Sequence, residues 1–182
     1  MKKIFLLSLT AILAIATFNS CDNDEIDVRD INPAPKVFPE PCTTWGCTVD
    51  SVKKHMSPFG LTFQDVYEKD VTLADGSNAQ KWFATFSGTN PYSSSNNAIV
   101  YEYCFDESGS GLKAIGIYLN GYGQFSNIET QLNDGGYTQT GRDIKDKYYI
   151  YSNGKTQIKV YDLGSNIVFM KYQKSGDDEL TW

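Results

Sequence analysis

Histidine is almost missing from this chain of 182 residues, since His55 is the only one. No serine or cysteine shares a recognisable catalytic motif with it, and Ser-His or Cys-His catalysis needs a base partnered with its nucleophile. We therefore assign His55 a structural role. The chain also lacks a phosphate-binding loop, a dinucleotide-binding fingerprint and a metalloprotease helix, so we expect no cofactor and no metal.

Basic residues are also few. From Cys21 onward, 14 Lys and Arg residues stand against 22 Asp and Glu residues, a formal charge of −8. Binding to nucleic acid needs a basic surface that neutralises phosphates, so we do not expect nucleic acid as a partner. The acidic excess favours solubility and names no partner.

The one sustained apolar run, Ile4–Phe18, is shorter than the roughly 20 apolar residues that span a bilayer. It follows two lysines and ends just before Cys21. A charged start, a short apolar core and a cysteine at this position predict a signal peptide over residues 1–20 and a lipid on Cys21.

This N-terminus resembles that of bacterial lipoproteins, although Phe18 and Ser20 stand where Leu and Gly or Ala are usual. Ser before the cysteine and the acidic run Asp22–Asp27 are similar to the Bacteroidetes type, which is exported to the outer face of the outer membrane. The resemblance implies a membrane-anchored protein at the cell surface, with the periplasmic face as the alternative. A multiply acylated cysteine would be a stable anchor.

Residues 21–41 are acidic and proline-rich and predict an extended tether. Whether Val37 and Phe38 pack along the domain edge stays open at this point. The folded domain is expected over residues 42–182.

Two amphipathic segments in this domain share one spacing. The first has Thr48 as its expected N-cap, and the second has Ser126 and Glu129 as an expected capping box. Four matched positions are 76 residues apart: Val49 and Phe125, Val52 and Ile128, Met56 and Leu132, Gly60 and Gly136. This spacing predicts an internal duplication, with repeats at 42–120 and 121–182.

Runs with alternating apolar residues and short turns follow each helical segment and predict antiparallel strands. The first four are Leu61–Val71, Gln80–Ser87, Ala98–Asp106 and Leu112–Asn120, and the second four are Tyr137–Thr140, Tyr148–Ser152, Thr156–Asp162 and Ile167–Gln173. The predicted fold class is α+β, with two helix-plus-antiparallel-sheet repeats of about 76 residues sharing one domain.

A helix followed by four antiparallel strands, twice over, resembles beta-lactamase inhibitory protein and the small outer-membrane assembly lipoproteins of the SmpA or BamE type. The resemblance spans Cys42–Gln173 and rests on element order. It implies binding to other proteins without catalysis, and it carries over no individual site residue.

Three cysteines remain beside Cys21, and at most two can pair within the chain. Cys42 with Cys47 is the favoured disulfide, and Cys47 with Cys104 is the alternative. The spacing of these cysteines and His55 is irregular for a zinc site, so we expect none.

Most tyrosines alternate within the expected strands, where sheet packing accounts for them. Tyr92 and Asn96 in the loop at 90–97, and Tyr122 in the loop at 120–123, lie in polar or glycine-rich segments instead. We expect these loops and an open sheet face to bind a ligand, first a protein and second a surface glycan. A carboxylate-dependent hydrolase is the remaining alternative, because carboxylate pairs cannot be recognised in a sequence.

Overall fold

The computed structural model describes residues 36–123, 125–177 and 180–181, all of which belong to one compact unit, Ala34–Trp182. Cys21 and most of the predicted tether lie outside the described residues. The described helical elements are α2 (Val49–Met56), the 3-10 helix η1 (Ser57–Phe59) and α3 (Phe125–Asp134). The strands are β1 (Thr62–Leu73), β2 (Asn78–Thr89), β3 (Ala98–Phe105), β4 (Leu112–Asn120), β5 (Thr138–Asp143), β6 (Tyr148–Ser152), β7 (Thr156–Gly164), β8 (Ile167–Lys174) and β9 (Leu180–Thr181).

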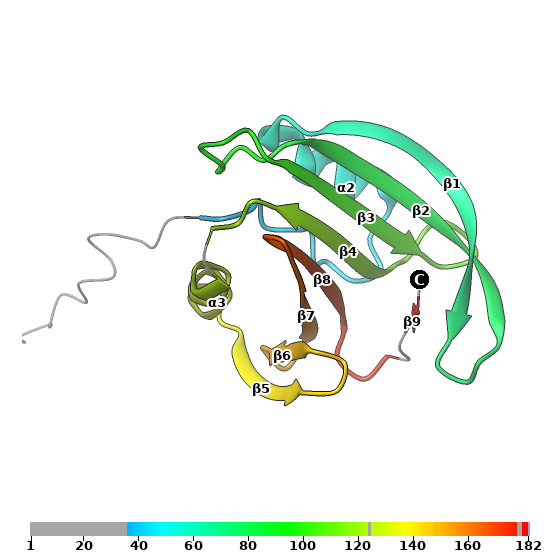
Figure 1. Ribbon diagram of the computed structural model, residues 1–182. Helices are drawn as coiled ribbons and strands as arrows, with labels where there is room; N and C mark the ends of the chain where they lie inside the picture. Colours follow the sequence, from blue (N-terminus) through cyan, green and yellow to red (C-terminus); the bar gives the residue numbers. More distant parts are fainter. Residues whose placement is uncertain (1–35, 124, 178–179, 182) are drawn as a thin grey trace, which may run out of the picture. The chain divides into compact units, whose positions relative to one another are not determined.

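The strands form one antiparallel sheet in the order β5-β6-β7-β8-β4-β3-β2-β1-β9 (Figure 1). β1 to β4 follow one another as hairpins, and so do β5 to β8. The two sets meet where β4 pairs with β8, from Ala114 opposite Gln173 to Asn120 opposite Ile167. The fold is α+β, and one helix precedes each set of four strands.

The ends of the helices follow from local chemistry. The Thr48 side chain accepts a hydrogen bond from the Ser51 backbone N–H and caps α2. Gly60 and Gly136, with φ of 69° and 81°, follow the two helical segments in the left-handed conformation that glycine tolerates best. The expected capping box of α3 is not formed: Ser126 lies within the helix, and the Glu129 carboxylate accepts a hydrogen bond from the Tyr151 hydroxyl at 3.0 Å.

Both helices pack on the same face of the sheet. Their buried residues are Val52 and Met56 in α2 and Ile128 and Leu132 in α3, and all four belong to one core cluster with alternate residues of the central strands. Neither helix contributes a buried residue to the opposite face, which we call the helix-free face. A smaller cluster lies there, formed by Val71, Phe83, Cys104 and Ala114.

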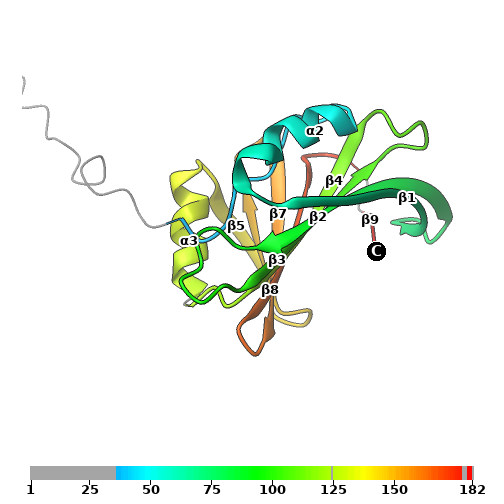
Figure 2. The same cartoon turned by 90° about the horizontal axis from the view of Figure 1, so that it is seen from above.

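The segment that leads into α2 completes the core. Figure 2 shows it passing between α3 and α2. Val37 and Phe38 are buried, which settles the alternative that the sequence left open. The Gln131 side chain of α3 accepts from both of their backbone N–H groups, at 2.6 and 3.2 Å, and donates to the Phe38 carbonyl at 2.8 Å. The packed chain therefore extends at least five residues before Cys42.

Replacing Gln131 with Ala should destabilise the domain by about 2–4 kcal/mol, because it leaves partly buried backbone groups without partners. Urea unfolding followed by circular dichroism measures the change. Gln64→Ala is the matched control, since Gln64 is exposed and makes one long bond to the Thr62 carbonyl, at 3.4 Å. Equal unfolding midpoints for the two variants would show that the Gln131 bonds to the entering segment add nothing to stability.

Candidate functional site

The two loops singled out in the sequence meet at one pocket. Tyr92 of the β2–β3 loop and Tyr122 of the β4–α3 segment both line a cavity of about 350 Å³, together with Asn166 from the β7–β8 turn. Asn96 is not among its lining residues; its neighbour Asn97 is. Asn96 instead occupies a turn position with φ of 54°. We call this cavity the loop pocket.

Buried amides fix the shape of the loop pocket. Asn90, only 2% exposed, donates from Nδ2 to the Val37 carbonyl at 2.7 Å and accepts at Oδ1 from the Tyr92 backbone N–H at 3.1 Å. Asn97 Nδ2 donates to the Ser93 hydroxyl at 3.0 Å and to the Gly121 carbonyl at 3.2 Å. The β2–β3 loop is therefore tied both to the entering segment and to the β4–α3 segment.

Gly121 connects all three loops. Its carbonyl accepts from Asn97, and its N–H donates to the Asn166 carbonyl at 2.8 Å. Its φ is +68°, and a Cβ at this position would lie only 1.8 Å from Asn97 Nδ2. Only glycine allows the backbone at this position to lie so close to the Asn97 side chain.

The lining of the loop pocket is polar and almost uncharged. Most of its described side chains carry amide or hydroxyl groups, and Lys36 is the only charged one among them. The Tyr122 hydroxyl donates to Asp162 Oδ1 at 3.4 Å, just outside the lining. Partial burial and this carboxylate raise the pKa of Tyr122, so its hydroxyl stays protonated at neutral pH.

A second surface lies on the helix-free face. Four aromatic side chains occupy paired positions on adjacent strands: Tyr148 on β6, Tyr161 on β7, Phe169 on β8 and Tyr118 on β4. Successive ring centroids are 5.0, 5.7 and 4.7 Å apart. We call these residues the aromatic row. Sequence alternation marks each of them only as a strand residue, and the row emerges once the strand register is known.

Several lysines also lie on the helix-free face. Lys159 Nζ lies 4.9 Å from the centroid of Tyr148, and Lys69 Nζ lies 5.4 Å from that of Phe83. At the far end, Lys81 pairs with Glu107 at 3.2 Å.

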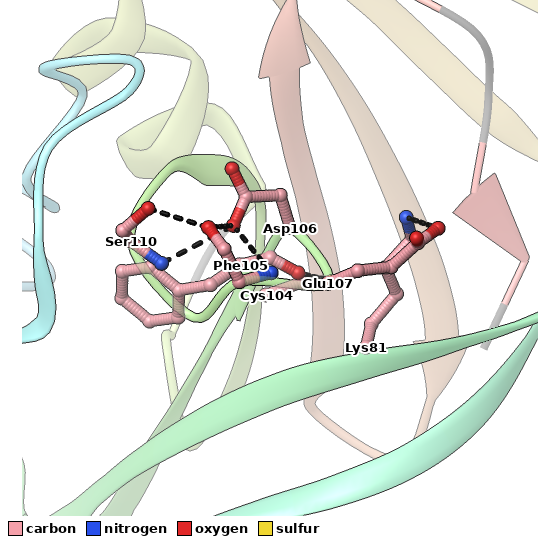
Figure 3. Close-up of polar contacts among 7 residues, drawn as sticks. Lys81, Cys104, Phe105, Asp106, Glu107 and Ser110 are labelled. Atoms are coloured by element: carbon pink, nitrogen blue, oxygen red, sulfur yellow. Dashed lines mark hydrogen bonds and ion pairs between the residues drawn. The ribbon is translucent and has the colours of Figure 1, made fainter.

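The adjoining turn is built on Asp106, whose Oδ1 accepts from Ser108 and from the Ser110 backbone N–H (Figure 3). These bonds lower the pKa of Asp106 and account for its carboxylate as part of the turn.

Cysteines lie on both faces of the sheet. The sulfurs of Cys42 and Cys47 are 3.9 Å apart, whereas Cys104 belongs to the cluster on the helix-free face. A Cys47–Cys104 bond would have to cross the sheet, which disulfide geometry does not allow without backbone movement. The Cys42–Cys47 disulfide stays a prediction. Burial raises the pKa of Cys104 to about 12, so this thiol is unreactive at neutral pH.

His55 is exposed at the end of α2. Its Nε2 lies 2.9 Å from the Glu40 carbonyl oxygen, and its ring packs near Phe59. It lines neither the loop pocket nor the helix-free face. Within the described part of the chain, no group of three or more His, Cys, Asp or Glu side chains is arranged to hold a metal ion.

None of the described helices is long and apolar enough to cross a membrane. No protein-family model, no curated protein and no solved structure matches the chain.

Replacing Gly121 with Ala should destabilise the domain by about 2–4 kcal/mol, because the methyl group displaces Asn97 and breaks the bond between the loops. Gly76→Ala is the control: φ there is +84°, but no atom lies within 4 Å of the added Cβ, so only backbone strain of about 1 kcal/mol is expected. Thermal unfolding of both variants gives the comparison. If Gly121→Ala loses no more than Gly76→Ala, the loops are not held together by this contact.

Proposed function

We propose that this chain is a lipid-anchored cell-envelope protein of the outer membrane, and that it binds another protein without catalysis. The anchor is Cys21, which lies outside the described residues and rests on the signal-peptide pattern that precedes it. The binding surface is the helix-free face. The aromatic row on that face is the observation that carries the proposal.

Aromatic residues are the usual anchors of protein interfaces, because they bury large areas and lose little conformational entropy. In the aromatic row each ring contacts the next across neighbouring strands, so the rings are held in place before a partner arrives. Tyr118 is 38% exposed, and Ile167, on the same face, is 36% exposed. A preformed apolar strip with aromatic anchors fits a protein partner better than a small molecule.

The tandem repeat belongs to the same proposal. The buried helix positions Val52 and Ile128 are 76 residues apart, and a β-bulge interrupts the first strand of each set at the same interval. The bulge lies between Phe63 and Asp65 in β1 and between Gln139 and Gly141 in β5. Helix positions and bulges are separate features, and their common spacing supports two copies of one ancestral unit that build a single sheet.

Two other functions were open from the sequence. A carboxylate-dependent hydrolase would need buried carboxylates in a cleft, and no Asp or Glu is among the buried residues of the described chain. Glycan binding has a specific observation in its favour, the polar lining of the loop pocket, which lies apart from the helix-free face.

The partner test uses the full chain in detergent, immobilised and exposed to envelope and extracellular extracts. We expect a protein to be retained by the native chain and lost by the Tyr118→Ala/Phe169→Ala double variant. Titration with the purified partner should then show binding weakened at least about thirtyfold, the effect of removing an interface hot spot. Tyr92→Ala, an exposed tyrosine away from this face, is the matched control. Equal binding by the native chain and the double variant would refute the assignment.

The location test compares protease accessibility on intact cells with that on cells whose outer membrane has been opened. We expect digestion on intact cells, because the acidic run after Cys21 resembles a surface-export signal. Protection until opening would place the partner in the periplasm instead. A Cys21→Ala variant should leave the membrane fraction, and if it stays there the lipid anchor is wrong.

A further inference from the structure

We propose that the loop pocket is a saccharide-binding site, separate from the protein-binding surface on the helix-free face. The inference does not depend on the aromatic row. It follows from the lining, charge, size and rigidity of the cavity.

The lining of the loop pocket offers the groups that sugar hydroxyls require. Asn127 makes no hydrogen bond with another described residue, and the Oδ1 of Asn97 accepts none, so both amides can bond a ligand. An amide supplies a donor and an acceptor side by side, which matches a hydroxyl pair on neighbouring sugar carbons. The Ser94 and Ser95 hydroxyls add groups that can either donate or accept.

Two tyrosines provide the apolar part of such a site. Tyr92 is 40% exposed, and Tyr122 is half-buried; both line the cavity. The negative face of an aromatic ring attracts the positively polarised C–H groups on one face of a pyranose. A pocket with amides, hydroxyls and two tyrosine rings therefore matches both the polar and the apolar parts of a sugar.

The charge of the pocket argues against other polar ligands. A phosphate or nucleotide needs several cationic groups, and among the lining residues that the structure describes Lys36 is the only cation. A divalent cation is usually held by carboxylates, and no carboxylate is found among the described residues that line the pocket. The site thus fits a neutral saccharide, or one with a single carboxylate opposite Lys36.

The size and rigidity of the pocket agree with this ligand class. Its volume of about 350 Å³ is at the small end of the usual range for ligand pockets, enough for one or two sugar units. Buried Asn90 and the Gly121 bonds hold the loops before binding, which reduces the entropy lost when a ligand is bound.

Saturation-transfer NMR with the full chain in detergent tests the site. The probes are maltotriose, chitotriose and mannotriose as neutral saccharides and trigalacturonate as the acidic one. We expect transfer to at least one of them. Its affinity should fall about tenfold in Tyr92→Ala and in Asn127→Ala, the effect of losing one ring contact or one good hydrogen bond. Tyr92→Phe should keep most of the affinity, since the ring is retained.

Tyr118→Ala is the matched control, because Tyr118 is as exposed as Tyr92 but lies on the helix-free face. It should leave saccharide binding unchanged while weakening the protein partner, and Tyr92→Ala should do the reverse. If only trigalacturonate binds, and Lys36→Ala abolishes that binding, the site is one for acidic saccharides. Absence of transfer to every probe, or transfer that survives both Tyr92→Ala and Asn127→Ala, would overturn the proposal without affecting the protein-binding surface.

Discussion

The pairing of β4 with β8 is the contact on which the rest of the molecule depends. It joins two sets of four strands that are otherwise complete hairpin series, and its seven residue pairs lie in the middle of the sheet. In the register of this pairing, side chains of β4 and β8 that lie opposite each other point to the same face of the sheet. The two halves therefore share one core face, and α2 and α3 both cover it. The opposite face stays continuous, and the contact between Tyr118 and Phe169 crosses the join itself.

Two helices of eight and ten residues are too short to cover a sheet of this width alone. The segment entering the domain supplies the missing cover with Val37 and Phe38, and it is held by side chains from both halves. Gln131 belongs to the second half, and Tyr101, whose hydroxyl bonds to the Pro39 carbonyl, belongs to the first. A segment with the composition of a tether thus becomes part of the core, because its backbone bonds are satisfied by buried amides and hydroxyls.

The sequence predicted those features that depend on nearby residues. Thr48 and Gly60 marked the ends of the first helical segment, and alternation located all eight longer strands. The ligand-binding role expected of Tyr92 and Tyr122 stays a prediction, and the structure places both residues at one cavity. It did not predict features that depend on pairing between distant residues. Ser126 and Glu129 have the spacing of a capping box, but a tyrosine from β6 competes successfully for the carboxylate. The loop pocket is lined by Asn97 and not by the expected Asn96. The side chain of Asn97 bonds to the carbonyl of Gly121, which is distant in the sequence.

The two proposed binding surfaces meet at the β7–β8 turn, and this limits how independent they can be. Asn166 lines the loop pocket and bonds to Gly121, while Ile167, the next residue, faces the same side of the sheet as Phe169. Asp162 accepts from the Tyr122 hydroxyl just before a bulge in the same hairpin. A ligand that shifts this turn must disturb both the Gly121 bond and the end of β8. Packed elements transmit such shifts only where they have an alternative arrangement. The β7–β8 turn is short, and two of its residues, Ser165 and Asn166, have positive φ. Any coupling between the two surfaces would therefore have to arise in this turn.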